Sequence, residues 1–168
     1  MSYLKLMKMM YLAEKQFLLT YGERMTGDKM VSMPLGPVLS SVYDCFLGGN
    51  EYWDSWIVNP GNYDLAIKSS VQVNRNDPLD TFDELSQADK AVLDSVFENF
   101  RNKNRWDLVN LLHDPKYCPE WENPQGSSYP IHAGSLLMKN GKTKEEADAI
   151  LKKIEEADSL CDATKGLV

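Results

Sequence analysis

The residues best suited to chemistry are two histidines, His113 and His132, and three cysteines. His113 precedes Asp114, a pairing in which an imidazole can act as a general base and a carboxylate can orient it. No nucleophile stands at a recognised spacing from this pair. We therefore favour structural roles for both histidines, and keep a small enzyme that uses His113 and Asp114 as a further alternative.

The three cysteines, Cys45, Cys118 and Cys161, are far apart and lie outside any Cys-x-x-Cys spacing. Disulfide frameworks and structural zinc sites both require closer and more regular spacing. The sequence also contains neither a phosphate-binding glycine loop nor a metalloprotease helix motif. We therefore expect reduced thiols, no metal, no cofactor and a protein that is not an enzyme.

The charge balance limits the class of partner. The 168 residues include 18 Lys and Arg against 25 Asp and Glu, which gives a formal net charge of −7. Proteins that grip nucleic-acid phosphates have the opposite balance, so we expect no nucleic-acid partner. The most apolar stretch, Met7 to Leu19, is interrupted by Lys8, Glu14, Lys15 and Gln16 and is too short to span a bilayer. We expect no membrane partner.

Acidic and aromatic residues suggest a protein partner. The segment from Asp77 to Glu98 is acidic, which we interpret first as a solvated helix face and second as a region that attracts a basic protein. We expect Trp53 and Trp56 to lie in a strand, where residues three apart point to opposite faces. One of them would then be exposed, and an exposed tryptophan is a good interface anchor.

Helices are expected to carry most of the first half. The residues from Leu4 to Thr20 predict a nearly buried central helix, with Lys5, Lys8 and Lys15 on one narrow stripe. Lys29 to Met33 predicts an extended segment. A tight turn follows, in which Gly36 takes a backbone angle closed to other residues and Pro37 opens a helix that runs to Phe46.

A β-hairpin is expected next. Its strands are Tyr52 to Val58 and Leu65 to Val73, joined by a loop of about four residues, Asn59 to Asn62. The stretch Asn74 to Asp80 has the turn chemistry of a linker.

The second half is predicted to be helical. Ser86 and Asp89 form a capping signal for a helix through Phe100, and Trp106 to His113 forms a shorter helix with Trp106 on its apolar face. Three further elements are expected: an ordered loop from Cys118 to Tyr129, a helix from Pro130 to Lys139, and a helix to about Ser159 opened by the capping box of Thr143 and Glu146.

These elements define the expected fold. It is an α+β, mostly α-helical fold, a compact bundle of about five to six helices with a small antiparallel β-hairpin after the second helix. We expect one domain over residues 1–168, with a core at 4–121 and a C-terminal helical extension at 130–160.

Several blocks between Leu4 and Trp121 resemble one family in the same order. They are Leu4–Ala13, Thr26–Asp28, Val31–Ser40, Val42–Asp44, Leu85–Ser86, Trp106–Leu108, Leu111–His113 and Trp121. Together they resemble the SocA-like antitoxins, whose domain is called Panacea. The most specific block is Gly36-Pro37-Val38 after an extended segment. Leu35 departs from the family pattern, where histidine or tyrosine is common, which weakens a catalytic role for this turn.

The resemblance implies a cytoplasmic bacterial or phage protein that neutralises a co-encoded toxin by binding it directly. The alternative within the family is a proteolytic adaptor that delivers the toxin to an ATP-dependent protease. Both require a protein interface, and a homo-oligomer stays open. We predict partner-binding residues at Leu35, Gly36, Pro37, Tyr43, Trp53 and Trp56.

Overall fold

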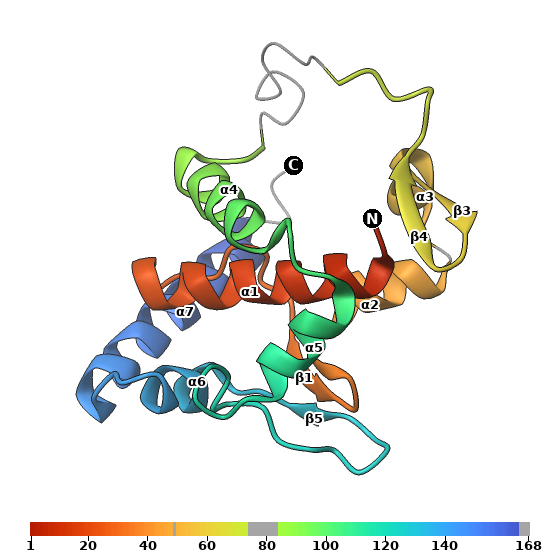
Figure 1. Cartoon of the computed structure of the whole chain (residues 1–168). Helices are drawn as coiled ribbons and strands as arrows, with labels where there is room; N and C mark the ends of the chain where they lie inside the picture. The colour runs from red at the N-terminus through yellow and green to blue at the C-terminus, as the bar shows by residue number, and fades with distance from the viewer. Residues whose placement is uncertain (49, 74–83, 165–168) are drawn as a thin grey trace.

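One long helix organises the molecule. In the computed structural model, which describes residues 1–48, 50–73 and 84–164, α1 (Tyr3–Tyr21) runs across the middle. On one side lies α4 (Gln87–Phe100), and on the other lie α5 (Arg105–His113) and a small sheet (Figure 1). Eleven of the 19 residues of α1 are buried, so the predicted central helix is confirmed.

Local signals set both ends of α1. The Ser2 hydroxyl accepts a hydrogen bond from the Lys5 N–H at 3.3 Å and so caps the first turn. Gly22 adopts a left-handed φ of 65° and donates its N–H to the Leu18 carbonyl, which ends the helix.

The first sheet has three short antiparallel strands. β1 (Met30–Met33) pairs with β2 (Gly36–Leu39) across a turn at Pro34 and Leu35. The prediction that Pro37 opens a helix is therefore wrong, and the helix α2 (Ser40–Leu47) begins three residues later. Pro37 has no backbone N–H to donate, and β2 tolerates this because it is an edge strand.

The third strand comes from far along the chain. β5 (Tyr129–Pro130) pairs with β1, and the next residue, Ile131, donates its N–H to the Met30 carbonyl at 2.8 Å. Pro130 was expected to open a helix, but it lies in this strand. The following helix, α6 (Ala133–Lys139), begins after His132. Only the tertiary fold brings the two segments together, so the local pattern missed the pairing.

The segment after α2 also differs from its prediction. Tyr52 to Trp56 was expected to be a strand but forms a short helix, α3 (Glu51–Trp56), because the Asn50 side chain caps it by accepting from the Trp53 N–H. Trp53 and Trp56 are therefore about one helical turn apart rather than on opposite faces of a strand.

The predicted hairpin exists but is shorter. β3 (Ile57–Gly61) pairs with β4 (Asp64–Ile67), and Asn62 and Tyr63 connect them with left-handed φ values of 56° and 61°. Two consecutive left-handed residues give a tight turn that suits the twist of a hairpin. The expected loop of about four residues is thus replaced by a turn of two.

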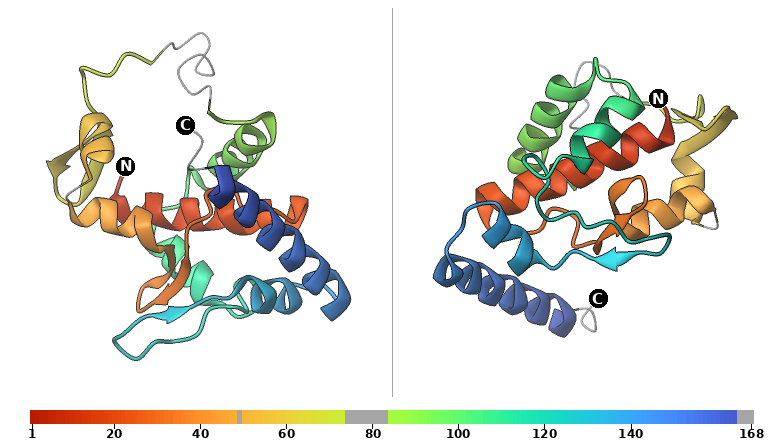
Figure 2. Two further views of the ribbon diagram at one scale, coloured as in Figure 1. Left: turned by 180° about the vertical axis from the view of Figure 1, so that it is seen from behind. Right: turned by 60° about the horizontal axis from the view of Figure 1, so that its bottom comes forward.

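The hairpin packs against the start of the chain. Tyr3 donates its N–H to the Tyr63 carbonyl at 2.9 Å, and its ring stacks on Phe46 of α2 at 3.9 Å between ring centroids. The hairpin therefore lies at the N-terminal end of α1, and the views in Figures 1 and 2 place it at the opposite end of the molecule from α6.

The helices of the second half follow their predicted caps. Capping boxes join Ser86 to Asp89 before α4 and Thr143 to Glu146 before α7 (Lys144–Thr164), which is longer than expected. The predicted linker at 74–80, including the acidic residues Asp77 and Asp80, lies outside the described residues, as does Asp83.

The core joins all of these helices except α2 and α3 through buried side chains, with Val92 and Val96 from α4. The fully buried ones from α1, β2, α5, α6 and α7 include Tyr11, Leu18, Leu39, Leu108, Leu112, Leu136, Leu137 and Ala147. The expected α+β, mostly helical fold is confirmed, with seven helices in the described residues because α3 replaces a predicted strand.

Candidate functional site

Leu35 stands at the tip of the turn between β1 and β2, with 43% of its side chain exposed. It lines a cavity of about 290 Å³ between this turn, α1 and α2. The side chains around this cavity, which we call the Lys8 cavity, are Tyr3, Leu4, Met7, Lys8, Met33, Pro34, Leu35, Val38 and Tyr43.

A second hollow, of about 170 Å³, lies on the other side of Leu35. It shares Tyr3, Leu4 and Leu35 with the Lys8 cavity and adds Tyr63, Arg105 and Trp106. Tyr63 is 66% exposed and Trp106 is 51% exposed, and the Arg105 guanidinium lies 5.6 Å from the Trp106 ring centre. We call the surface formed by Tyr3, Leu35, Tyr43, Tyr63 and Trp106 the Leu35 face.

The predicted interface residues are only partly brought together. Leu35 and Tyr43 line the same cavity, whereas Gly36 and Pro37 are buried beneath the turn. Trp53 is half-buried and Trp56 is 38% exposed on α3, and neither lines either hollow.

Sequence reasoning missed Tyr63 and Trp106. Trp106 was expected to face the core because it shares a helical face with Val109. It lies instead in the first turn of α5, half exposed, while the buried positions of that helix begin at Leu108. The cap at Asn104, whose side chain accepts from the Trp106 and Asp107 N–H groups, was the available signal that Trp106 lies at the helix end.

Lys8 and His113 meet below the turn. Lys8 is fully buried, and its Nζ donates to the Pro37 carbonyl at 2.9 Å. A Cβ atom on Gly36 would lie 3.3 Å from Lys8 Nζ and 3.6 Å from His113 Nε2, and the φ of Gly36 is +94°. The backbone angle therefore favours glycine here, and the Cβ atom of another residue would also crowd Lys8 Nζ. Burial lowers the pKa of Lys8 to about 7.

His113 is held by packing rather than by Asp114. Its ring lies on Trp121 at 4.1 Å between centroids, and Trp121 Nε1 donates to the Met33 carbonyl at 3.1 Å. Burial and the neighbouring charge of Lys8 lower the pKa of His113. Asp114 accepts a hydrogen bond from the Lys116 N–H, and the described residues show no hydrogen bond between His113 and Asp114, so these two do not form the oriented pair that the sequence suggested.

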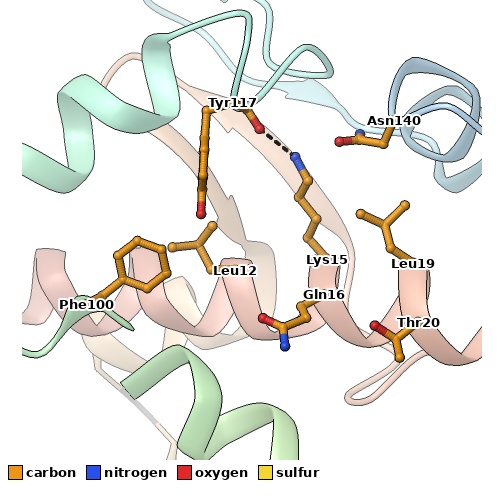
Figure 3. A pocket seen from close by; sticks show the side chains of 8 residues that line it. All are labelled: Leu12, Lys15, Gln16, Leu19, Thr20, Phe100, Tyr117 and Asn140. Carbon is orange, nitrogen blue, oxygen red and sulfur yellow. Dashed lines mark hydrogen bonds between the residues drawn. The ribbon is translucent and has the colours of Figure 1, made fainter. Parts of the chain in front are cut away.

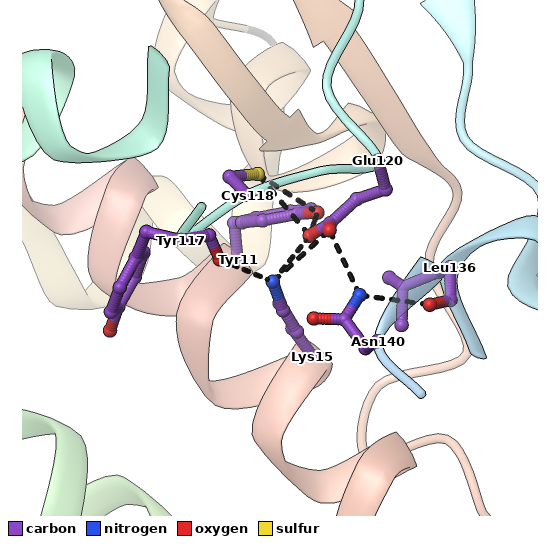
Figure 4. A network of polar contacts seen from close by, with 7 residues as sticks. All are labelled: Tyr11, Lys15, Tyr117, Cys118, Glu120, Leu136 and Asn140. Carbon is purple, nitrogen blue, oxygen red and sulfur yellow. Dashed lines mark hydrogen bonds and ion pairs between the residues drawn. The ribbon is translucent and has the colours of Figure 1, made fainter. Parts of the chain in front are cut away.

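A buried polar network, shown in Figure 4, ties α1 to the loop after α5 and to α6. Glu120 pairs with Lys15 at 2.8 Å, accepts from the Tyr11 hydroxyl at 2.6 Å, and accepts from Asn140 Nδ2 at 3.0 Å. Burial acts to raise the pKa of Glu120, but the hydrogen bonds from Lys15, Tyr11 and Asn140 outweigh it and hold that pKa below its usual value. Glu120 is therefore a carboxylate at neutral pH.

Cys118 belongs to the same network. Its thiol donates to Glu120 Oε1 at 3.2 Å, and burial, followed by the charge of Glu120, raises the pKa of Cys118 to about 12. Such a thiol is protonated at neutral pH and a poor nucleophile. The sequence had placed Lys8 and Lys15 on one polar stripe, and the fold covers that stripe.

A third cavity, of about 350 Å³, lies beside this network (Figure 3). Leu12, Leu19 and Phe100 give it apolar walls, and Lys15 lines it too. The amine of Lys15 is already engaged by Glu120 and by the Tyr117 carbonyl at 2.9 Å. The only cation among the described lining residues is thus neutralised, and the cavity has little to offer a charged ligand.

The block Thr26-Gly27-Asp28, which contributes to the family resemblance, makes hydrogen bonds that hold the fold together. The N–H and hydroxyl of Thr26 both donate to Glu14 Oε2 at 2.8 Å. Asp28 accepts from the backbone N–H groups of Ser41 and Val42 and so caps α2. The block therefore anchors the turn after α1 and starts the next helix.

Comparisons with known proteins identify the family of this chain. A family model described as antitoxin SocA-like, Panacea domain, matches residues 6–122, which include most of α1, the turn at Leu35, α5 and Trp121. No curated protein and no solved structure matches the chain. In the described part of the chain, every helix is too short or too polar to cross a membrane. Because the match covers more than half of the sequence, the chain belongs to the SocA-like antitoxin family with the Panacea domain.

Proposed function

We propose that this chain neutralises a co-encoded toxin by direct binding, and that the Leu35 face is the binding surface. The observation that carries the proposal is a group of exposed apolar side chains, Leu35, Tyr63 and Trp106, around two adjacent hollows in an antitoxin-family domain. Protein interfaces are centred on such aromatic and aliphatic anchors.

The support below this face favours tight binding. The Leu35 turn is held from beneath by the bond from Lys8 to the Pro37 carbonyl and from the side by the bond from Trp121 to the Met33 carbonyl. A surface that is already ordered loses less conformational entropy on association than a flexible loop.

Acidic side chains on α4 supply a second contribution to toxin binding. Asp94 and Glu98 are exposed on this helix, where Glu98 pairs with Arg101 at 3.3 Å and Asp89 is engaged in the capping box. Exposed acidic residues accelerate association with a basic partner, and this effect weakens as salt concentration rises.

Co-expression with the protein encoded next to this chain tests the proposal. We expect the neighbour to stop growth when it is expressed alone, growth to recover when both are present, and the two proteins to purify as a stable complex. A neighbour that is harmless alone and does not co-purify would contradict the proposal.

The same experiment distinguishes the adaptor alternative. If growth recovers because the neighbour disappears, and it reappears in cells that lack an ATP-dependent protease, the chain delivers the toxin for degradation. In direct masking, the toxin persists at a normal level in complex with this chain.

A further inference from the structure

The Lys8 cavity combines an apolar wall with one buried cationic group. Met7, Val38, Leu35 and Tyr43 form its apolar surroundings, and Lys8, which is fully buried, lines it as well. At about 290 Å³ the cavity is at the small end of the range of ligand-binding pockets, which begins at about 300 Å³. It is large enough for a short aliphatic chain or a single ring.

Lys8 is short of partners. Its Nζ makes one hydrogen bond within the described residues, to the Pro37 carbonyl, although an ammonium group has three donors. The ion pairs of the described residues include none to Lys8, in contrast to Lys15, which is paired with Glu120. A buried ammonium without a counter-ion is costly, so the site favours an anion brought from outside.

His113 is a second group short of partners near Lys8. Its Nε2 is buried and has no hydrogen-bond partner among the described residues. A Cβ atom built on Gly36 would lie 3.3 Å from Lys8 Nζ and 3.6 Å from His113 Nε2, so the two nitrogens lie near each other beside Gly36, whereas His113 does not line the Lys8 cavity. An anion in the Lys8 cavity favours the protonated form of Lys8, and a neutral His113 adds no second charge beside it.

We propose that the Lys8 cavity binds a small carboxylic acid with an apolar body. The carboxylate pairs with Lys8 Nζ, and the apolar body packs between Met7, Leu35 and Val38. A carboxylate suits the site because its single charge matches one buried ammonium, whereas a doubly charged phosphate would leave a charge uncompensated in an apolar cavity. The proposal does not depend on toxin binding.

Matched pairs of probes test the proposal on the unmodified chain. Hexanoate and 3-phenylpropionate are the acids, and hexanamide and 3-phenylpropionamide are neutral controls of nearly equal size. In a two-dimensional NMR titration we expect the acids to shift the backbone signals of Leu35 and Val38 saturably. The amides should bind more weakly by a factor of more than about ten, because the charged hydrogen bond to Lys8 is lost.

Two lysine variants of α1 supply a second test. Lys8→Met should abolish the preference for acids over amides, whereas Lys5→Met should retain it, since Lys5 Nζ binds the Arg101 carbonyl away from the cavity. The NMR spectrum of each variant reports whether it is folded. If Lys8→Met does not fold, the acid and amide comparison on the unmodified chain decides alone.

Three results would overturn the proposal: equal binding of acids and amides, binding of neither at the highest soluble concentration, or undiminished acid binding by folded Lys8→Met. All of these measurements use the chain without a toxin. Their failure therefore leaves the antitoxin proposal standing, and a failure of co-expression leaves the carboxylate proposal standing.

Discussion

Lys8 shows how a single buried side chain makes folding depend on pH. Folded Lys8 releases its proton near pH 7, whereas unfolded Lys8 keeps it up to its ordinary pKa of 10.5. Between these values the unfolded state binds more protons, so stability rises with pH. Below about pH 7 both states are protonated, and the cost of burying the charge is fully present and constant.

We predict that this dependence disappears in Lys8→Met. From about pH 7 to 9, the free energy of unfolding of the unmodified chain should rise relative to the variant by about 1.4 kcal/mol per pH unit. Denaturant unfolding of both proteins at several pH values measures the difference. The neighbouring thiol of Cys118 stays protonated over this range and is common to both proteins. If the free energies of unfolding of the unmodified chain and of Lys8→Met changed in parallel with pH, Lys8 would not titrate as its burial implies.

At the scale of elements, the pair of Lys15 and Glu120 joins α1 to the loop after α5. Removing Glu120 leaves the buried ammonium of Lys15 without its partner. We therefore predict that Glu120→Leu lowers the free energy of unfolding by about 3–5 kcal/mol. The double variant with Lys15→Met should recover part of the loss, because both buried charges are then gone.

An exposed pair provides the matched control for that prediction. Glu122 and Lys139 are 2.7 Å apart but accessible to water. Exposed pairs contribute little to stability, so Glu122→Leu should change the unfolding midpoint only slightly. If Glu120→Leu and Glu122→Leu lowered the free energy of unfolding equally, burial would not explain why the pair of Lys15 and Glu120 stabilises the fold.

At the scale of the whole molecule, the Leu35 face is assembled from α1, α2, α5, the turn between β1 and β2 and the turn between β3 and β4. We predict that Leu35→Ala and Trp106→Ala each weaken toxin binding by about 1 kcal/mol or more without unfolding the chain. Met138→Ala is the control, because Met138 is 49% exposed on α6 at the far end of the molecule. Calorimetric titration with purified toxin measures all three.

Trp53 and Trp56 test how far this surface extends. If the interface reaches α3, Trp56→Ala should weaken toxin binding by a similar amount. Unchanged affinity in folded Trp53→Ala and Trp56→Ala variants would remove α3 and its hairpin from the interface. Unchanged affinity in Leu35→Ala and Trp106→Ala would remove the Leu35 face itself.

Several elements were predictable from the sequence because their signals are local. The apolar pattern of α1, the stop at Gly22, and the capping boxes of Ser86 and Thr143 each act within a few residues. The family resemblance likewise depends on ordered blocks of sequence and is confirmed over residues 6–122.

Other features were decided only by contacts between distant segments. The β1–β5 pairing joins residues about a hundred positions apart, and this sheet makes Pro37 part of an edge strand. Lys8 and Lys15 are buried because α5, β2 and the Glu120 loop cover one side of α1. A pattern along one helix shows which residues share a face, but not what covers it. The sequence therefore determined the central helix, the capped helices of the second half and the family, whereas the tertiary fold decided which charges are buried and which aromatic side chains form an exposed face.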